Sequence, residues 1–310
     1  MFRAAGLRSA ETWRARFRIW GMRYSRGGII AVLLAAEVFV AGAIVWLVNG
    51  HNFTVNAAGM HRTAEQGKAF APIDAGNSPR VVVDDPDSRV DVAVSADGKV
   101  HVTDATVAQG WMWGNEKRAP LQVARIAGGV SIVRPGNSHL NVMFGYLDER
   151  IEVQVPAGAQ LDVQRCSAAE ISGLNGAVRV HSVDGHITAT DVRTQNLTLA
   201  SDDGRLTLDN VSAAALDAST KDGSIHADNL QTGGGTLQSG DGSITVAFAP
   251  NANLAVHART GDGRLTFDGR RAQRGDDDAS SGDYTVGAGG GSLQVTTQDG
   301  SIHITSNGAR

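Results

Sequence analysis

The sequence predicts an all-β, repetitive β-solenoid domain that is preceded by one N-terminal transmembrane helix. Asp-Gly pairs recur at equal spacing through the C-terminal half, and each pair is followed by alternating apolar residues. Near the N-terminus, 21 residues from Gly28 to Val48 carry a single charge. Gly accounts for 38 of 310 residues and aromatic residues for only 5%, which is typical of small side chains packed between many tight turns.

The repeat is defined by the Asp-Gly pairs. They begin at Asp184, Asp203, Asp222, Asp241, Asp262 and Asp299. Their spacings are 19, 19, 19, 21 and 37 residues. Equal spacing indicates a repeat architecture, and the last interval is close to two further units. We therefore expect stacked coils of about 19 residues.

Each unit supplies two short strands. After the first pair, Ile187 and Ala189 are the second and fourth residues beyond Gly185, and this period of two predicts a half-buried strand. A second strand follows at Leu197–Leu199. One unit has too little apolar surface to fold alone, whereas stacked units form continuous apolar ladders. Gly at each corner would tolerate a positive φ. A meander folded into a sandwich or prism, with Asp-Gly as hairpin turns, is the alternative.

Residues 80–169 are less regular but still strand-like. The pattern Ile151–Val163 returns at Ile244–Val256, which indicates an N-terminal part of the same sheet system with longer insertions. We therefore assign residues 80–310 to one β domain. Residues 49–79 lack periodicity and are interpreted as a tether.

The stretch Ile151–Val163, followed by repeated Ser/Thr-x-Asp-Gly-x-Ile/Leu-x-Ala/Leu units, resembles the bacterial DUF4097 family, described as putative adhesins. The resemblance covers roughly residues 80–306 and is carried by the register of six copies. It implies a β-solenoid-like, extracytoplasmic domain and brings no catalytic residues. Family members typically use Ser-Gly-Asp at the corner, where this chain mostly has Asp-Gly.

The N-terminus predicts a membrane anchor. About 20 apolar residues span a bilayer as a helix, and residues 27–48 satisfy that length. Residues 1–26 carry seven Arg and one Glu, so the positive-inside rule places this tail in the cytoplasm and the β domain outside the cytoplasmic (inner) membrane. A cleaved signal peptide with a site near Ala57 is the rival. Glu37 within the span could serve helix packing or a homo-oligomer contact.

Composition excludes several function classes. Residues 51–310 hold 21 Lys and Arg against 30 Asp and Glu, so nucleic acid is not an expected partner. Cys166 stands alone, and the nine His residues form no metal-binding motif. The Asp residues lie at regular corners, which favours turn formation over a Ca²⁺ ladder or a catalytic carboxylate pair. We therefore expect no catalytic residue, no cofactor and no metal.

Trp111 and Trp113 are the candidate ligand-binding residues. They lie in Gly110–Gly114, which we interpret as an exposed loop, where two indoles could bind a glycan or a partner protein. They could equally cover the open N-terminal end of the solenoid. The insertion Gly269–Asp278 contains Arg-Gly-Asp and is interpreted as a solvated loop.

The function that these patterns favour is binding. We expect a membrane-anchored, non-catalytic domain acting in adhesion or envelope scaffolding, with the bilayer and an envelope protein or glycan as partners. One alternative is a regulatory membrane protein that senses a ligand or envelope stress through a partner, because a 26-residue tail is too short for a signalling domain. A polysaccharide-active β-helix enzyme is the other.

Overall fold

The structure is a computed structural model that describes residues 60–65, 67–113, 119–136, 142–272 and 280–306. The chain divides into two compact units, Met1–Ala57 and Ala58–Arg310, of which the second holds all the described residues. Those residues form 26 strands and no helix. The transmembrane helix predicted at residues 27–48 lies outside them, and none of the described segments is a helix capable of crossing a bilayer.

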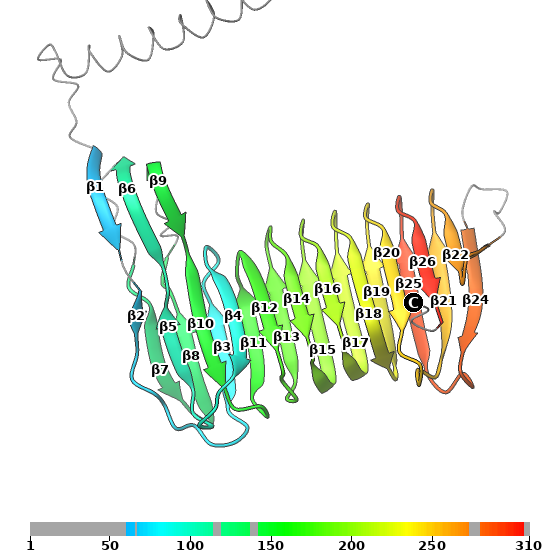
Figure 1. Ribbon diagram of the computed structural model, residues 1–310, viewed down its shortest axis with the longest axis horizontal. Helices are drawn as coiled ribbons and strands as arrows, with labels where there is room; N and C mark the ends of the chain where they lie inside the picture. Colours follow the sequence, from blue (N-terminus) through cyan, green and yellow to red (C-terminus); the bar gives the residue numbers. More distant parts are fainter. Residues whose placement is uncertain (1–59, 66, 114–118, 137–141, 273–279, 307–310) are drawn as a thin grey trace, which may run out of the picture. The chain divides into compact units, whose positions relative to one another are not determined.

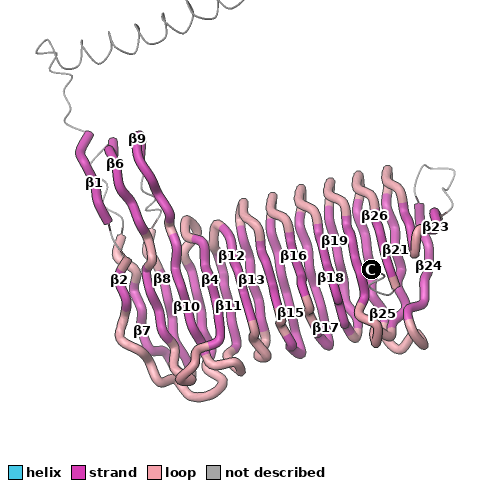
Figure 2. Tube along the Cα trace, in the orientation of Figure 1, coloured by secondary structure: helices cyan, strands magenta, loops and turns pink. Residues whose placement is uncertain are grey.

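Twenty-three of these strands form a coiled sheet with two long faces, joined by short turns (Figures 1 and 2). We call the end that holds β2 and β7 the proximal end, and the end that holds β23 and β24 the distal end. From proximal to distal, the first face runs β2 (Lys68–Ala69), β5 (His101–Asp104), β10 (Arg150–Val155), β4 (Arg89–Val94), β12 (Ala168–Ser172), β14 (Ile187–Thr190), β16 (Leu206–Asp209), β18 (Ile225–Thr232), β20 (Ile244–Phe248), β26 (Ile302–Thr305), β22 (Leu265–Phe267) and β23 (Arg270–Arg271). The second face runs β7 (Gln122–Ile126), β8 (Gly129–Val133), β3 (Arg80–Asp84), β11 (Gln160–Arg165), β13 (Val178–Ser182), β15 (Arg193–Ser201), β17 (Ser212–Thr220), β19 (Gly234–Ser239), β25 (Ser292–Thr297), β21 (Leu254–Thr260) and β24 (Ser280–Val286).

Neighbouring coils pair through parallel strands. This pairing favours the solenoid-like stack, because a meander of hairpins would pair antiparallel. On the first face, Ile187 is the register partner of Leu206, which in turn pairs with Ile225 and then Ile244. All four side chains are buried, as are Leu197 and its partner Leu216 on the second face. The inward residues of both faces form one hydrophobic core, so the predicted apolar ladders are confirmed.

The order of the coils departs from the sequence near the distal end. The last coil, β25 and β26, does not follow β21 and β22 outward but lies between them and β19 and β20. The expectation that the 37-residue interval spans two successive coils is therefore wrong. The chain instead leaves room for one coil, adds β23 and β24 as antiparallel strands at the end, and returns to fill the gap.

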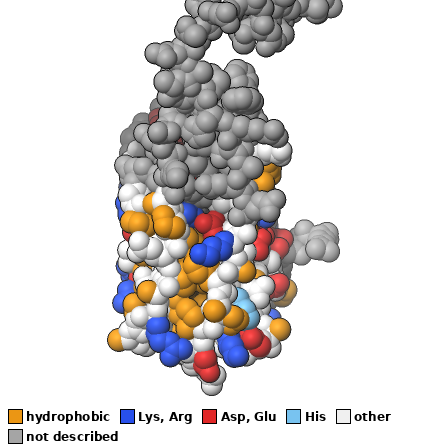
Figure 3. All heavy atoms as spheres, turned by 90° about the vertical axis from the view of Figure 1, so that its left-hand side faces the viewer, with side chains coloured by type: hydrophobic (Ala, Val, Ile, Leu, Met, Phe, Trp, Pro, Cys, Tyr) orange, Lys and Arg blue, Asp and Glu red, His pale blue; other side chains and the backbone are white. Residues whose placement is uncertain are grey.

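Both ends of the stack are closed by antiparallel strands. At the proximal end these are β7, β5 and β2, and at the distal end β24 and β23. Proximally, Phe70, Ile73 and Ala75 also pack against the core (Figure 3 looks onto this end). Residues 60–79, expected as part of the tether 49–79, thus contribute β1, β2 and an end cover, while residues 49–59 lie outside the described part.

The Asp-Gly corners are built differently from our expectation. Their glycines, Gly223 among them, do not have a positive φ; that conformation occurs at the opposite corner, at Asp191, Asn210 and Asn229. Gly is needed because the coils approach closely: a Cβ on Gly223 would lie 1.9 Å from the carbonyl oxygen of Gly204.

A buried hydroxyl holds each corner to the next coil. Thr220 Oγ1 accepts a hydrogen bond from the Gly223 amide at 3.1 Å and donates one to the Gly204 carbonyl at 3.0 Å. Ser201, Ser239 and Thr260 repeat this pattern. The Ser/Thr of the repeat is therefore the residue that ties successive corners together.

Candidate binding surfaces on the small sheet and at the distal end

Three strands form a small antiparallel sheet beside the proximal end, in the order β1 (Met60–Glu65), β6 (Val107–Trp113) and β9 (Val142–Asp148). Each adjoins in sequence a strand of the first face: β1 precedes β2, β6 follows β5, and β9 precedes β10. Figure 1 shows the three strands projecting beyond the row of coils. The small sheet thus continues from the first face of the solenoid, because each of its strands neighbours a strand of that face along the chain.

Trp111 and Trp113 lie in β6, so the prediction that they belong to a loop is wrong. Gly110, one of the glycines that suggested a loop, instead pairs with Gly145 in the antiparallel strand β9. Because successive residues of a strand alternate between faces, Trp111 and Trp113 share one face of the small sheet. Phe70, Ile73 and Ala75 pack against the core at the proximal end, and a covering role for the two Trp residues stays a prediction.

The register adds two aromatic residues that the sequence analysis missed. Phe144 is the partner of Trp111, and Tyr146 is the partner of Gln109, which lies on the same face as Trp111. Tyr146 is 60% exposed. Phe144 and Tyr146 are two residues apart in the sequence. This spacing is typical of residues on one face of a strand, and it could have identified them. We call Trp111, Trp113, Phe144 and Tyr146 the aromatic face.

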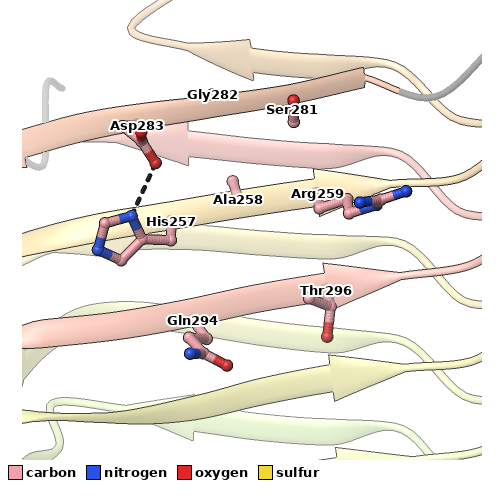
Figure 4. Close-up of a pocket in the computed structure, with 8 residues that line it drawn as sticks. All are labelled: His257, Ala258, Arg259, Ser281, Gly282, Asp283, Gln294 and Thr296. Atoms are coloured by element: carbon pink, nitrogen blue, oxygen red, sulfur yellow. Dashed lines mark hydrogen bonds and ion pairs between the residues drawn. The ribbon is translucent and has the colours of Figure 1, made fainter. Parts of the chain in front are cut away.

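A second surface is a shallow groove on the second face at the distal end. It encloses about 470 Å³ and crosses β24, β21 and β25 (Figure 4). Its lining residues are His257, Ala258, Arg259, Ser281, Gly282, Asp283, Gln294 and Thr296. The sequence analysis predicted no site here, because the groove depends on antiparallel pairing of β24 across an insertion.

Two polar rows border the groove. In one, His257 Nδ1 lies 2.7 Å from Asp283 Oδ1, and Gln294 is the register partner of His257. In the other, Arg259 is the register partner of both Ser281 and Thr296. Within the described part of the chain, Arg259 forms no ion pair or side-chain hydrogen bond. The groove therefore offers an unpaired cation among hydroxyl groups.

The described residues hold neither a metal-binding cluster nor a reactive thiol. These residues contain no group of three or more His, Cys, Asp or Glu able to hold a metal ion. Corner residues such as Asp203 and Asp222 are exposed and spaced one coil apart. Cys166 is fully buried, with its Sγ 3.5 Å from the His181 carbonyl oxygen.

The Cys166 thiol is expected to be chemically silent in the folded protein. Burial raises its pKa to about 12, so at pH 8 only about one molecule in 10⁴ carries the reactive thiolate. A thiol reagent such as dithionitrobenzoate should label the native protein hardly at all at pH 8, and one thiol per chain after denaturation. Rapid labelling of the native protein would contradict the burial of this side chain.

The family model described as Toastrack DUF4097 matches residues 84–310. One similar solved structure is that of "a putative cell adhesion protein" from Clostridium sporogenes ATCC 15579, with 13% identity, a TM-score of 0.34, and 79% of this chain and 99% of that chain covered. Another is that of "a putative adhesin" from Bacteroides fragilis NCTC 9343, with 14% identity, a TM-score of 0.46, and 78% and 95% covered. No curated protein matches the chain. Because the family model spans nearly all the coils, the chain belongs to the Toastrack DUF4097 family.

Proposed function

We propose that this protein is a membrane-anchored, extracytoplasmic binding domain that acts without catalysis in adhesion or envelope scaffolding. The observation that carries the proposal is the aromatic face, where the register pairs Trp111 with Phe144 and places Tyr146 two residue pairs further along. The apolar stretch at residues 27–48 and the basic tail before it support the anchor.

Aromatic residues on a sheet suit recognition of envelope glycans or proteins. Rings supply large contact areas and lose few rotamers on binding, which keeps the entropic cost of association low. Strand pairing fixes the backbone positions of these residues before any ligand arrives, and such preorganisation raises affinity. A solenoid that presents one such face needs no chemical step in order to adhere.

The test is a binding experiment with the full-length protein in detergent, applied to arrays of envelope glycans and cell-wall polymers with and without Ca²⁺. We expect saturable binding that weakens by about 10- to 100-fold when Trp111 and Trp113 are both changed to Ala. Met112→Ala is the matched control, because Met112 lies on the same strand but on the opposite face. It should leave the affinity within about twofold of the wild-type value.

Two results would count against the proposal. Binding that survives the double Trp substitution would remove the aromatic face from the site, provided that thermal unfolding shows both variants folded. Absence of binding to every polymer would exclude direct glycan adhesion. Site-specific crosslinking from position 146 in intact cells would then test the alternative, a sensing role through a partner protein.

A further inference from the structure

We propose that the distal groove is a second binding site that takes a carboxylate-bearing saccharide. The inference rests on the proposed binding function and assigns it a ligand class. It is carried by different residues from those of the aromatic face, because the groove belongs to β21, β24 and β25 at the distal end and the small sheet adjoins the proximal end.

One end of the groove holds an anion subsite at Arg259. Arg259 is exposed, and its register partners Ser281 and Thr296 each bring a hydroxyl group from a neighbouring strand. Figure 4 shows these three residues at the same end of the groove. A guanidinium presents paired N–H donors that match a carboxylate, and the two hydroxyl groups can donate further hydrogen bonds to it.

The other end of the groove holds a subsite for neutral hydroxyl groups. The Asp283 carboxylate can only accept, so the 2.7 Å contact holds His257 with its Nδ1–H donated and its other ring nitrogen available. Asp283 is 82% exposed and keeps further acceptor capacity. Gln294, beside His257, has both a donor and an acceptor. Mixed donors and acceptors of this kind suit sugar hydroxyl groups.

The floor of the groove lies between the two polar rows. Ala258 and Gly282 are register partners there; the Ala258 methyl group is buried in the core and Gly282 has no side chain, so the floor is backbone. The rows lie two residues apart along the strands, or roughly 7 Å, which one sugar unit with its substituents can bridge. Peptide-binding grooves are commonly lined by apolar side chains, whereas the side chains that face outward into this groove are all polar. The groove therefore fits an acidic sugar better than a peptide.

The direct test is calorimetry on the full-length protein in detergent, with trigalacturonic acid as the first probe. Its methyl ester and neutral galactotriose are the matched ligands that lack the charge. We expect saturable binding of the acid and at least tenfold weaker binding of both controls. Oligosaccharides that contain glucuronate or N-acetylmuramate complete the panel, and failure of all of them to bind would overturn the inference.

Variants separate this site from the aromatic face. Arg259→Gln should weaken binding of the acid at least tenfold, whereas Arg179→Gln should not change it. Arg179 is the matched control because it is also an exposed Arg on the second face, on β13, outside the groove. Equal affinity in Arg259→Gln and wild type would overturn the groove as the site. In that case, the proposed function would still stand if the wild-type protein bound a polymer and the double variant with Trp111 and Trp113 changed to Ala did not.

Discussion

Replacing Gly223 by Ala is expected to destabilise the protein by about 3 kcal/mol or more. The added Cβ would lie 1.9 Å from the Gly204 carbonyl oxygen and 2.7 Å from Thr220 Oγ1. The Gly204 backbone cannot move away easily, because it lies just as close to the coil on its other side. A Cβ built on Gly204 would lie 1.8 Å from the Gly185 carbonyl oxygen. Urea unfolding of the variant and the wild type measures the difference.

Asp222→Ala provides the control for that substitution. Asp222 precedes Gly223 at the same corner, and its side chain is exposed. Its replacement should change the free energy of unfolding by no more than about 0.5 kcal/mol. If Gly223→Ala were as mild as this control, the close approach of successive corners would not be what requires Gly at the repeat.

Replacing Arg134 by Met is expected to cost about 3–5 kcal/mol, because it removes the guanidinium that neutralises a buried carboxylate. The Arg134 side chain is only 2% exposed; it contacts Asp85 Oδ2 at 2.7 Å, Asp104 Oδ2 at 2.9 Å and the Ala119 carbonyl oxygen at 2.7 Å. Burial lowers the pKa of Arg134, but its hydrogen bonds to Asp104 and Asp85 outweigh that effect and raise the pKa overall. The guanidinium therefore stays charged, and Asp85, which is fully buried, depends on it.

A surface ion pair supplies the comparison. Arg165 binds both carboxylate oxygens of Asp84, at 2.7 and 2.8 Å, yet its side chain is 53% exposed. Water and salt screen this pair, so Arg165→Met should cost less than about 1 kcal/mol. Thermal or urea unfolding of both variants would reveal the contrast. Similar losses for Arg134→Met and Arg165→Met would show that burial does not control the strength of these ion pairs.

The repeat could be predicted from the sequence because its physics is local. Ile225 and Ala227 alternate with polar residues, and the same alternation returns 19 residues later, so stacking in register follows directly. The position of β25 and β26 could not be predicted in this way. The Asp299 corner has the same motif as the others, and a motif that is equal in every coil does not determine which coil lies beside it.

The candidate surfaces show the same division between local and distant information. Trp111 and Trp113 could be identified by their residue type, but their strand and their neighbour Phe144 depend on pairing between segments over 30 residues apart. The groove required more, because His257 and Asp283 come together only through the antiparallel strand that follows the Gly269–Asp278 insertion. The anchor at residues 27–48 stays a prediction.

The intercalated last coil has a mechanical consequence. In a simple solenoid the terminal coil has one neighbour, and a pulling force on the chain end peels coils away one at a time. Here β25 is bonded to β19 and to β21, and β26 to β20 and to β22. A load that pulls on β26 must therefore break two rows of hydrogen bonds at once, one to β20 and one to β22. Such a clasp would resist tension at the end of the chain that carries the distal groove.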